Sequence, residues 1–256
     1  MDFFVQKNSI VRQIWGKSDT VLFIFAGAAA EFALNKAVDW LYFTGRLPTD
    51  PLGRLFSTVS YARKIIFAKN ESALKIIDSI YLIHKTVEKK RSSTIPDWAY
   101  RDVLFMLIHY SIASFEVLER KLSIDEKEEV YDVFFRFGER MKLKDLPPDY
   151  ASWIPQRKTD MENDLAKSRY TSDLFLQYKK HLGSIRYSIL IEGQKLIIPE
   201  KVRELLGFRK FSLLVLILPF YKLSRIVKLD KVVKKLLLPK KYEKEIREID
   251  VYNTAY

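Results

Sequence analysis

Apolar residues recur at helical spacing along most of this chain. One helix face is clearly marked by the positions Ile77, Ile80, Tyr81, His84 and Val87. The same periodicity, interrupted by proline, glycine and capping residues, predicts helices over residues 9–16, 19–43, 54–67, 71–91, 97–122, 123–141, 150–168, 171–181 and 199–207. Strands do not alternate with these helices, and no internal repeat is visible. We therefore predict an all-α fold, a single multi-helix domain in which only the apolar stretch 187–198 leaves room for a short strand.

Capping residues mark two of the helix starts. Ser18 or Asp19 suits the N-cap of the helix predicted over 19–43. Ser123 and Glu126 have the spacing of a capping box, in which each side chain accepts a hydrogen bond from the other residue's backbone N–H. Residues 45–53 contain two prolines and two glycines, which predicts a loop before the next helix.

Two apolar runs are too short to cross a membrane. Residues 21–30 are stopped by Glu31, and residues 211–221 contain Pro219. A spanning helix needs about 20 consecutive apolar residues. We expect both runs to form core helices or interface contacts.

The chain contains no cysteine, which excludes disulfides, a thiolate haem ligand, an iron–sulfur cluster and a cysteine-based zinc site. Its first residues do not resemble a secretory signal, because an acid stands at position 2 and no cleavage pattern follows. A cytoplasmic location is therefore the default expectation.

Positive charge is concentrated near the end of the sequence. The net charge is +12, and residues 222–241 hold eight Lys or Arg against one acid, Asp230, interleaved with apolar residues. This pattern divides the chain into a helical domain over residues 1–210 and a basic amphipathic segment over residues 211–256. The segment suits an anionic membrane surface or an acidic partner. The alternative is a terminal helix packed on the domain with a solvated basic face. We expect no nucleic-acid partner, because no known binding motif accompanies the charge.

Most catalytic templates are missing. The sequence has no nucleophile elbow, no phosphate-binding glycine-rich loop and no His-Glu-x-x-His pair. A di-iron bundle would need a glutamate three residues before a histidine. The residues at those positions are Tyr81, Met106 and Tyr178, so a carboxylate-bridged metal site is not expected.

His84, one of three histidines, lies on the apolar face described above. A buried imidazole needs a partner, because its desolvation otherwise costs about 1–3 kcal/mol. It is either a core histidine bonded to a carbonyl or carboxylate, or the axial ligand of a buried haem iron. Arg54, Thr58 and Arg63 on the preceding helix are possible partners for haem propionates; their alternative roles are surface arginines and a helix-facing threonine.

The other two histidines have different settings. His109 shares a helix face with Phe105, Ile112 and Glu116, which directs its ring into the core or a cavity. It could be a sixth iron ligand, a distal acid–base group or a core histidine paired with a carboxylate such as Glu116, and we favour the last. His181 lies near a predicted helix C-terminus, where a cation is favoured, so we expect a structural role.

The segment from Asp50 to Thr58 resembles the Asp-Pro-x-x-Arg-x-x-x-Thr motif of the MpaB and rubber oxygenase (latex-clearing protein) family. An apolar helix with Gly27-Ala-Ala-Ala30 lies before it, and a His-x-x-Val motif, here His84 to Val87, lies after it. The order of features continues through the Leu-Pro signal at 146–147, and the resemblance spans roughly residues 15–210.

The resemblance implies an all-α fold that encloses one haem b, with His84 as the proximal iron ligand. It implies an oxygenase that acts with O2 on an apolar small molecule or lipid-like substrate. Arg54 and Thr58 match positions near the haem, which implies propionate or distal-pocket roles, and Tyr61 and Arg63 are weaker candidates. His109 is a candidate for the distal chemistry.

Three departures from the family concern the distal side. Many relatives carry His-Pro after the first apolar helix, where this chain has Asn35 to Trp40. Many have glycine shortly after His-x-x-Val, where this chain has Glu88. Others have a histidine near Val103, whereas His109 lies about one turn later. The alternative function is a non-enzymatic helical protein that binds an apolar ligand, or an anionic membrane surface through its basic segment.

Overall fold

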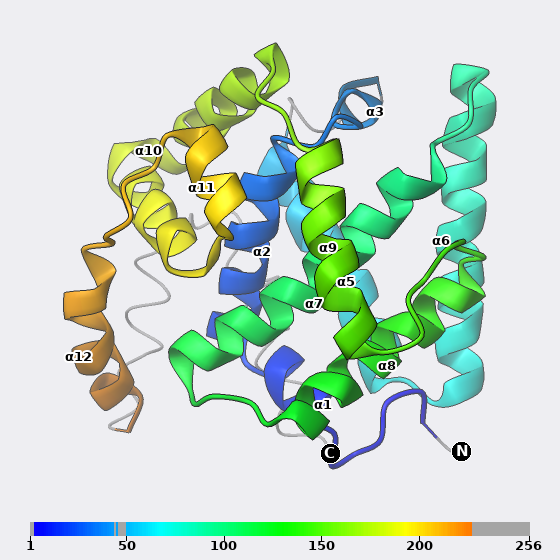
Figure 1. Ribbon diagram of the computed structural model, residues 1–256, viewed down its shortest axis with the longest axis horizontal. Helices are drawn as coiled ribbons and strands as arrows, with labels where there is room; N and C mark the ends of the chain where they lie inside the picture. Colours follow the sequence, from blue (N-terminus) through cyan, green and yellow to red (C-terminus); the bar gives the residue numbers. More distant parts are fainter. Residues whose placement is uncertain (1–2, 44, 46–49, 227–256) are drawn as a thin grey trace.

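The computed structural model describes residues 3–43, 45 and 50–226, apart from the side chains of residues 51, 52 and 55. The helices of this part, shown in Figure 1, are α1 (Ile10–Trp15), α2 (Ser18–Phe32), α3 (Asp39–Phe43), α5 (Pro51–Phe67), α6 (Asn70–Arg91), α7 (Asp97–Leu118), α8 (Ile124–Arg140), α9 (Tyr150–Asp164), α10 (Arg169–Ile197), α11 (Glu200–Leu206) and α12 (Leu214–Ile226). The all-α prediction is confirmed. The possible strand at 187–198 is wrong, because that stretch continues α10.

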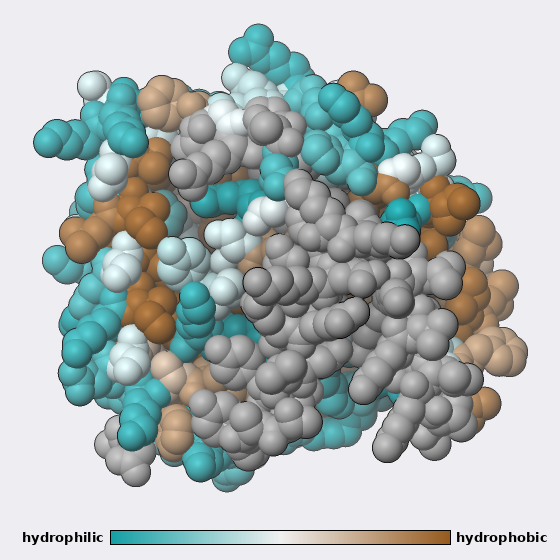
Figure 2. Space-filling view, turned by 180° about the vertical axis from the view of Figure 1, so that it is seen from behind, coloured by the Kyte–Doolittle hydropathy of each residue, from teal (hydrophilic) through white to brown (hydrophobic). Residues whose placement is uncertain are grey.

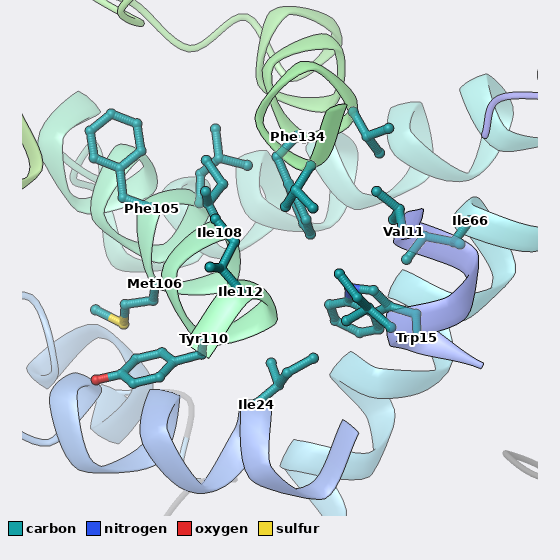
Figure 3. Packing of buried hydrophobic residues seen from close by; sticks show 14 of the residues in the cluster. Val11, Trp15, Ile24, Ile66, Phe105, Met106, Ile108, Tyr110, Ile112 and Phe134 are labelled. Carbon is teal, nitrogen blue, oxygen red and sulfur yellow. The ribbon is translucent and has the colours of Figure 1, made fainter. Parts of the chain in front are cut away.

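The core is built around the contact between α2 and α7, the most extensive one between helices of the described part. Gly27 allows this close approach: a Cβ atom there would lie 2.2 Å from the Tyr110 ring. Trp15 packs beside these helices, with its indole N–H donating to Ser111 Oγ at 3.1 Å. Figure 3 shows Trp15 and Tyr110 among the aliphatic side chains that join α1, α2, α7 and α8. The expectation that residues 21–30 form a core helix is therefore confirmed.

The helix predicted over 19–43 is interrupted. α2 ends at Phe32, and Asn35 forms an isolated β-bridge with Leu165. The Asn35 side chain explains the break: its Oδ1 accepts from the Ala37 N–H at 2.9 Å, and its Nδ2 donates to Asp102 at 2.7 Å. Side-chain bonds of this kind compete with helical ones. The short helix α3 then begins at Asp39.

The predicted N-cap of α2 is also wrong. Lys17 is the N-cap residue, without a side-chain capping bond, and Ser18 is already helical. Asp19 lies in the first turn, where its Oδ1 accepts from the Thr20 N–H at 2.9 Å. Its negative charge there complements the helix dipole.

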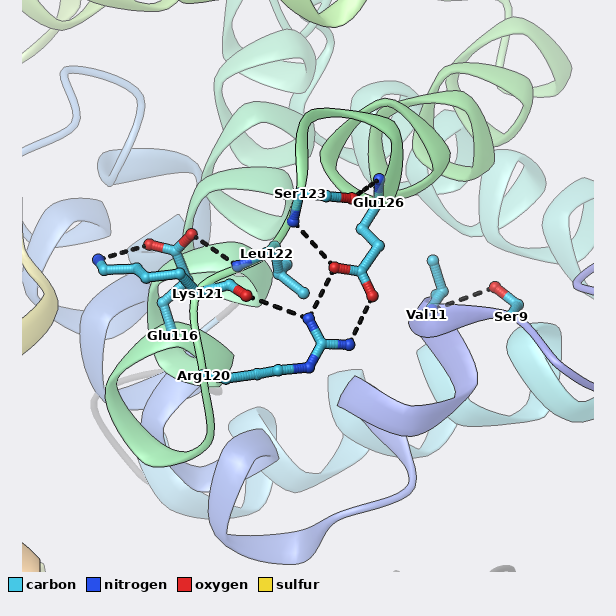
Figure 4. Close-up of polar contacts among 8 residues, drawn as sticks. All are labelled: Ser9, Val11, Glu116, Arg120, Lys121, Leu122, Ser123 and Glu126. Carbon is cyan, nitrogen blue, oxygen red and sulfur yellow. Dashed lines mark hydrogen bonds and ion pairs between the residues drawn. The ribbon is translucent and has the colours of Figure 1, made fainter.

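The capping box between α7 and α8 is confirmed. Ser123 Oγ accepts from the Glu126 N–H at 3.2 Å, and Glu126 accepts from the Ser123 N–H at 2.9 Å (Figure 4). Arg120 adds two hydrogen bonds to the same carboxylate, at 2.6 and 2.8 Å. α7 therefore ends at Leu118, four residues before the predicted end, because residues 119–123 form this connection.

α10 is longer than the predicted helix over 171–181 because it continues beyond a kink. Gly183 has φ 75°, a left-handed conformation that glycine adopts without strain. The arm before the kink bonds α3, where Tyr42 donates to Asp173 at 2.7 Å. The arm after it bonds α2, where Gln194 donates to the Ala26 carbonyl at 3.0 Å. His181 stands two residues before the kink, near a helix C-terminus as expected.

Within residues 3–43, 45 and 50–226, none of the helices is both long and apolar enough to span a bilayer. The predicted basic segment over 211–256 begins with α12, whereas its residues 227–256 lie outside the described part. The run 211–221 is not a core helix, because most of its large apolar side chains are exposed.

The α2–α7 contact predicts how two glycines respond to the same substitution. Gly27→Ala should lower the free energy of unfolding by about 1–3 kcal/mol, because the new methyl group overlaps the Tyr110 ring. Gly193→Ala in α10 is the control, since the nearest atom to its added Cβ lies 4.0 Å away. It should be neutral or raise stability by up to about 1 kcal/mol. Urea unfolding followed by circular dichroism checks both, and equal losses would contradict the packing described.

Candidate functional site

His84 is half-buried in α6, which packs against α5, and it lies near Arg54 of that helix. Ile77 on the same helix face is completely buried, and Ile80, His84 and Val87 are half-buried, as their spacing predicts. α6 ends at Ser92, which has φ 52° and turns the chain toward α7. The α5, α6 and α7 helices thus meet around His84.

The two ring nitrogens of His84 have different surroundings. Nδ1 lies 2.9 Å from the Ile80 carbonyl oxygen, one turn earlier in α6. A carbonyl can only accept, so Nδ1 carries the proton and Nε2 carries the lone pair. This arrangement satisfies one nitrogen, as a core histidine requires, and it also orients the ring as a metal-binding histidine requires.

Burial lowers the pKa of His84, and the positive charge of nearby Arg54 lowers it further. The bond to the Ile80 carbonyl opposes this change without cancelling it. The imidazole is therefore neutral at pH 7. A neutral imidazole with an unprotonated Nε2 is the form that binds a metal.

Tyr100 of α7 packs against the His84 ring, and Glu88 of α6 holds Tyr100 in place. The rings of Tyr100 and His84 lie 5.3 Å apart between centroids and are nearly perpendicular, at 82°. The Tyr100 hydroxyl donates to Glu88 at 3.2 Å, and the same carboxylate oxygen accepts from the Ile95 N–H at 3.0 Å. Lys85 pairs with the other oxygen at 2.7 Å. These bonds hold the pKa of Glu88 below its usual value, although its burial acts in the opposite direction.

Sequence reasoning missed both residues. Glu88 stands four positions after His84 and therefore lies on the same, largely apolar helix face. A carboxylate is unexpected there, and this could have marked Glu88 as a residue of the site. Tyr100 gave no such signal, because only the turn between α6 and α7 brings it to His84.

The four residues of α5 that were predicted to hold the cofactor differ in burial and in contacts. Arg54 is half-buried and near His84, as its effect on the histidine pKa shows. Thr58 is half-buried, and its hydroxyl donates to the Arg54 carbonyl at 3.2 Å. Tyr61 is 38% exposed. Arg63 is buried, donates to the Trp15 carbonyl of α1 and lies 5.2 Å from the Phe67 ring, so its contacts are those of a packing residue.

His109 occupies a second site farther along α7. Its Nε2 lies 3.4 Å from the Ile197 carbonyl, and its ring centroid is 4.9 Å from that of Tyr110. The favoured pairing with Glu116 is wrong, because that carboxylate binds Lys121, Lys127 and the Leu122 N–H instead (Figure 4). Tyr100 and His109 lie about 13 Å apart along the helix axis. A role for His109 in distal chemistry stays a prediction.

A buried polar network adjoins His109. Arg157 of α9 donates to Glu31 of α2, and Tyr110 of α7 donates to the other Glu31 oxygen at 2.8 Å. Glu31 is completely buried and Arg157 nearly so. The sequence suggested only that Glu31 ends an apolar run. Its function in joining three helices depends on tertiary structure.

Burial shifts the pKa values of two side chains in this region in opposite directions. It lowers the pKa of His109 to about 4, and the charge of Arg157 contributes. It raises the pKa of Asp102 to about 7, with a further contribution from the negative charge of Asp164. The neutral form of each group is therefore favoured in the fold.

Within the described residues, no group of three or more His, Cys, Asp or Glu side chains could hold a metal ion. A depression of about 400 Å³ lies at the end of α6, lined by charged and hydroxyl side chains: Lys85, Glu88, Lys89, Ser92, Ser93 and Thr94. Its polar lining does not provide walls for an apolar ligand.

Comparison with known proteins gives one match. Residues 13–213 match the family described as "ER-bound oxygenase mpaB/B'/Rubber oxygenase, catalytic domain". Neither the curated proteins nor the solved structures include a match to this chain.

The opposite pKa shifts predict opposite pH responses. The stabilising contribution of His109 is complete above about pH 6.5 and is lost as pH falls toward 4. That of Asp102 is complete below about pH 3.8 and is lost as pH rises through 7. We compare the change in the free energy of unfolding when the pH is raised from 4.5 to 7. Relative to the unaltered protein, this change should be about 2 kcal/mol less favourable in His109→Gln and about 2 kcal/mol more favourable in Asp102→Asn. Urea unfolding at both pH values tests this, and changes of the same sign in the two variants would refute it.

Proposed function

The chain belongs to the mpaB/rubber oxygenase catalytic-domain family, and from this premise we propose that it is a haem b-dependent oxygenase. Its substrates are O2 and an apolar small molecule or lipid-like compound. The family match supports the oxygenase class. The geometry of His84 supports the cofactor and the position of its ligand.

The single observation that carries the proposal is the unequal use of the two His84 nitrogens. Nδ1 is bonded to the Ile80 carbonyl, and the lowered pKa leaves Nε2 unprotonated. A haem iron needs one such nitrogen on its proximal side, and no cluster of carboxylates is required. The residues present therefore fit haem in this respect.

Arg54 supplies the positive charge that haem propionates require. It lies near His84, one helix away, and it cannot lose its proton at physiological pH. Thr58 is one turn further along α5 and bonds the Arg54 carbonyl, which places its side chain on the same part of the helix. We assign Arg54 to a propionate and Thr58 to the pocket wall, with Tyr61 at its outer edge and Arg63 as a packing residue beneath α5.

Glu88 and Tyr100 are positioning residues in this proposal. Glu88 holds the Tyr100 hydroxyl and the Ile95 N–H, and Tyr100 places its ring against His84. The imidazole is thereby held by the Tyr100 ring and by the bond from Nδ1 to the Ile80 carbonyl.

When bound, haem would supply the iron that binds and activates O2. The chain would hold the proximal imidazole neutral, and Arg54 would neutralise a propionate. His109 is kept as a candidate for distal proton transfer, which requires that its bond to the Ile197 carbonyl opens.

Replacing His84 tests the proximal assignment. The purified protein, produced with ample haem, should show a Soret absorption band, and His84→Ala should lose most of it because no other imidazole lies in the same position. His181→Ala is the matched control and should retain the band. Added imidazole should restore the band in His84→Ala by entering the vacated space. A colourless unaltered protein, or an unchanged spectrum in the variant, would refute the proposal.

The role of Arg54 predicts a smaller effect. Arg54→Met should weaken haem binding by at least about tenfold, since a hydrogen-bonded ion pair to a charged group contributes about 1.5–3 kcal/mol. Lys64→Met removes the same charge from an exposed position of the same helix and should leave haem affinity unchanged. Haem titration of the apoprotein measures both, and equal affinities would exclude Arg54 from the site.

A further inference from the structure

Helix α12 presents its apolar side to solvent. Five large apolar residues follow helical spacing on one face and form what we call the outer stripe: Leu213 (52% exposed), Leu216 (63%), Ile217 (55%), Phe220 (73%) and Leu223 (60%). Hydrophobic side chains gather along the right edge of Figure 2, the side on which α12 lies in that view. Contiguous exposed apolar surface of this kind marks an interaction site.

The side of α12 that faces the protein combines the half-buried Leu214 and Leu218 with polar contacts made by the helix and by the residues just before it. Ser212 donates to the Glu192 carbonyl of α10 at 2.8 Å, and Tyr221 donates to Asp19 of α2 at 3.0 Å. Arg225 pairs with Asp19 and with Glu119 at the end of α7. A surface helix usually turns its large apolar side chains inward, whereas most of those of α12 are exposed. Specific polar bonds therefore hold α12 with its outer stripe facing away from the core.

The charge around the outer stripe indicates what covers it. Residues 207–226 contain no acid, and Arg209, Lys210 and Lys222 flank the outer stripe, whereas Arg225 is already paired with Asp19 and Glu119. Arg209 and Lys210, immediately before the stripe, are exposed. A second copy of the chain packed stripe against stripe would bring these like charges together. An anionic surface would instead neutralise them.

The length of α12 determines how it can meet a bilayer. Its 13 residues extend about 20 Å, less than the roughly 30 Å of a hydrocarbon core. A short helix with an apolar face and flanking cations lies in the plane of the membrane interface. We propose that the outer stripe of α12 docks the protein on an anionic phospholipid surface, with Phe220 and Leu216 inserted among the lipids. This inference rests on α12 alone and does not require haem at His84.

Vesicle flotation with the full-length protein tests the proposal. Vesicles of phosphatidylcholine with phosphatidylserine should capture the protein, and raised salt or phosphatidylcholine alone should reduce capture. The double variant Leu216→Ser/Phe220→Ser should bind at least about tenfold more weakly. The control, Leu82→Ser/Ile124→Ser, alters two apolar side chains of similar exposure, 63% and 68%, on other helices. It should bind as the unaltered protein does.

A second measurement separates insertion from electrostatic attraction alone. Tryptophan in Phe220→Trp should be quenched by brominated lipids, whereas tryptophan in Ile124→Trp should not. The proposal would be overturned if vesicles captured Leu216→Ser/Phe220→Ser as well as the unaltered protein. It would also be overturned if brominated lipids quenched the two introduced tryptophans equally. A vesicle-free dimer that Leu216→Ser/Phe220→Ser dissociates would overturn it as well, because the stripe would then be covered by a second copy.

Discussion

The described structure depends on one buried arrangement, in which Glu31 accepts from Arg157 and Tyr110 where α2 and α7 approach most closely. Burying an ion pair costs desolvation free energy, which is offset only when its hydrogen bonds are made. Here the carboxylate has a partner on each oxygen, one from α7 and one from α9. Gly27 brings α2 close enough for the Tyr110 ring to lie beside the α2 backbone. Three helices distant in sequence thus acquire one fixed arrangement.

α7 connects this arrangement to the other parts of the molecule. Its first turn carries Tyr100, which contacts His84, and its middle carries Tyr110. Just beyond its end, Glu119 pairs with Arg225 of α12. The proposed haem ligand on α6, the core and the proposed membrane contact on α12 are therefore all linked to α7. Their relative positions follow from helix geometry rather than from loops.

The sequence contained much of the fold and part of the site. Periodicity and the Ser123–Glu126 capping box located most helices, because both signals act within a few residues. The break after α2 was missed, since it depends on Asn35 reaching Asp102, 67 positions later. His84 was found from its place on an apolar face, whereas Tyr100 was not, because a turn brings it there. The orientation of α12 was equally inaccessible, because composition cannot say that Tyr221 and Arg225 bond the protein while Leu216 and Phe220 are exposed.

The kink at Gly183 has a consequence for how this sequence can vary. The arms on its two sides have different neighbours, α3 before the kink and α2 with α12 after it. Adding or deleting one residue between them would rotate the second arm by about 100°, so Gln194 would no longer face α2. Ser184 and Ile185, by contrast, are exposed and open to exchange. We therefore expect this corner to keep its length and the glycine at position 183, while its exposed side chains vary.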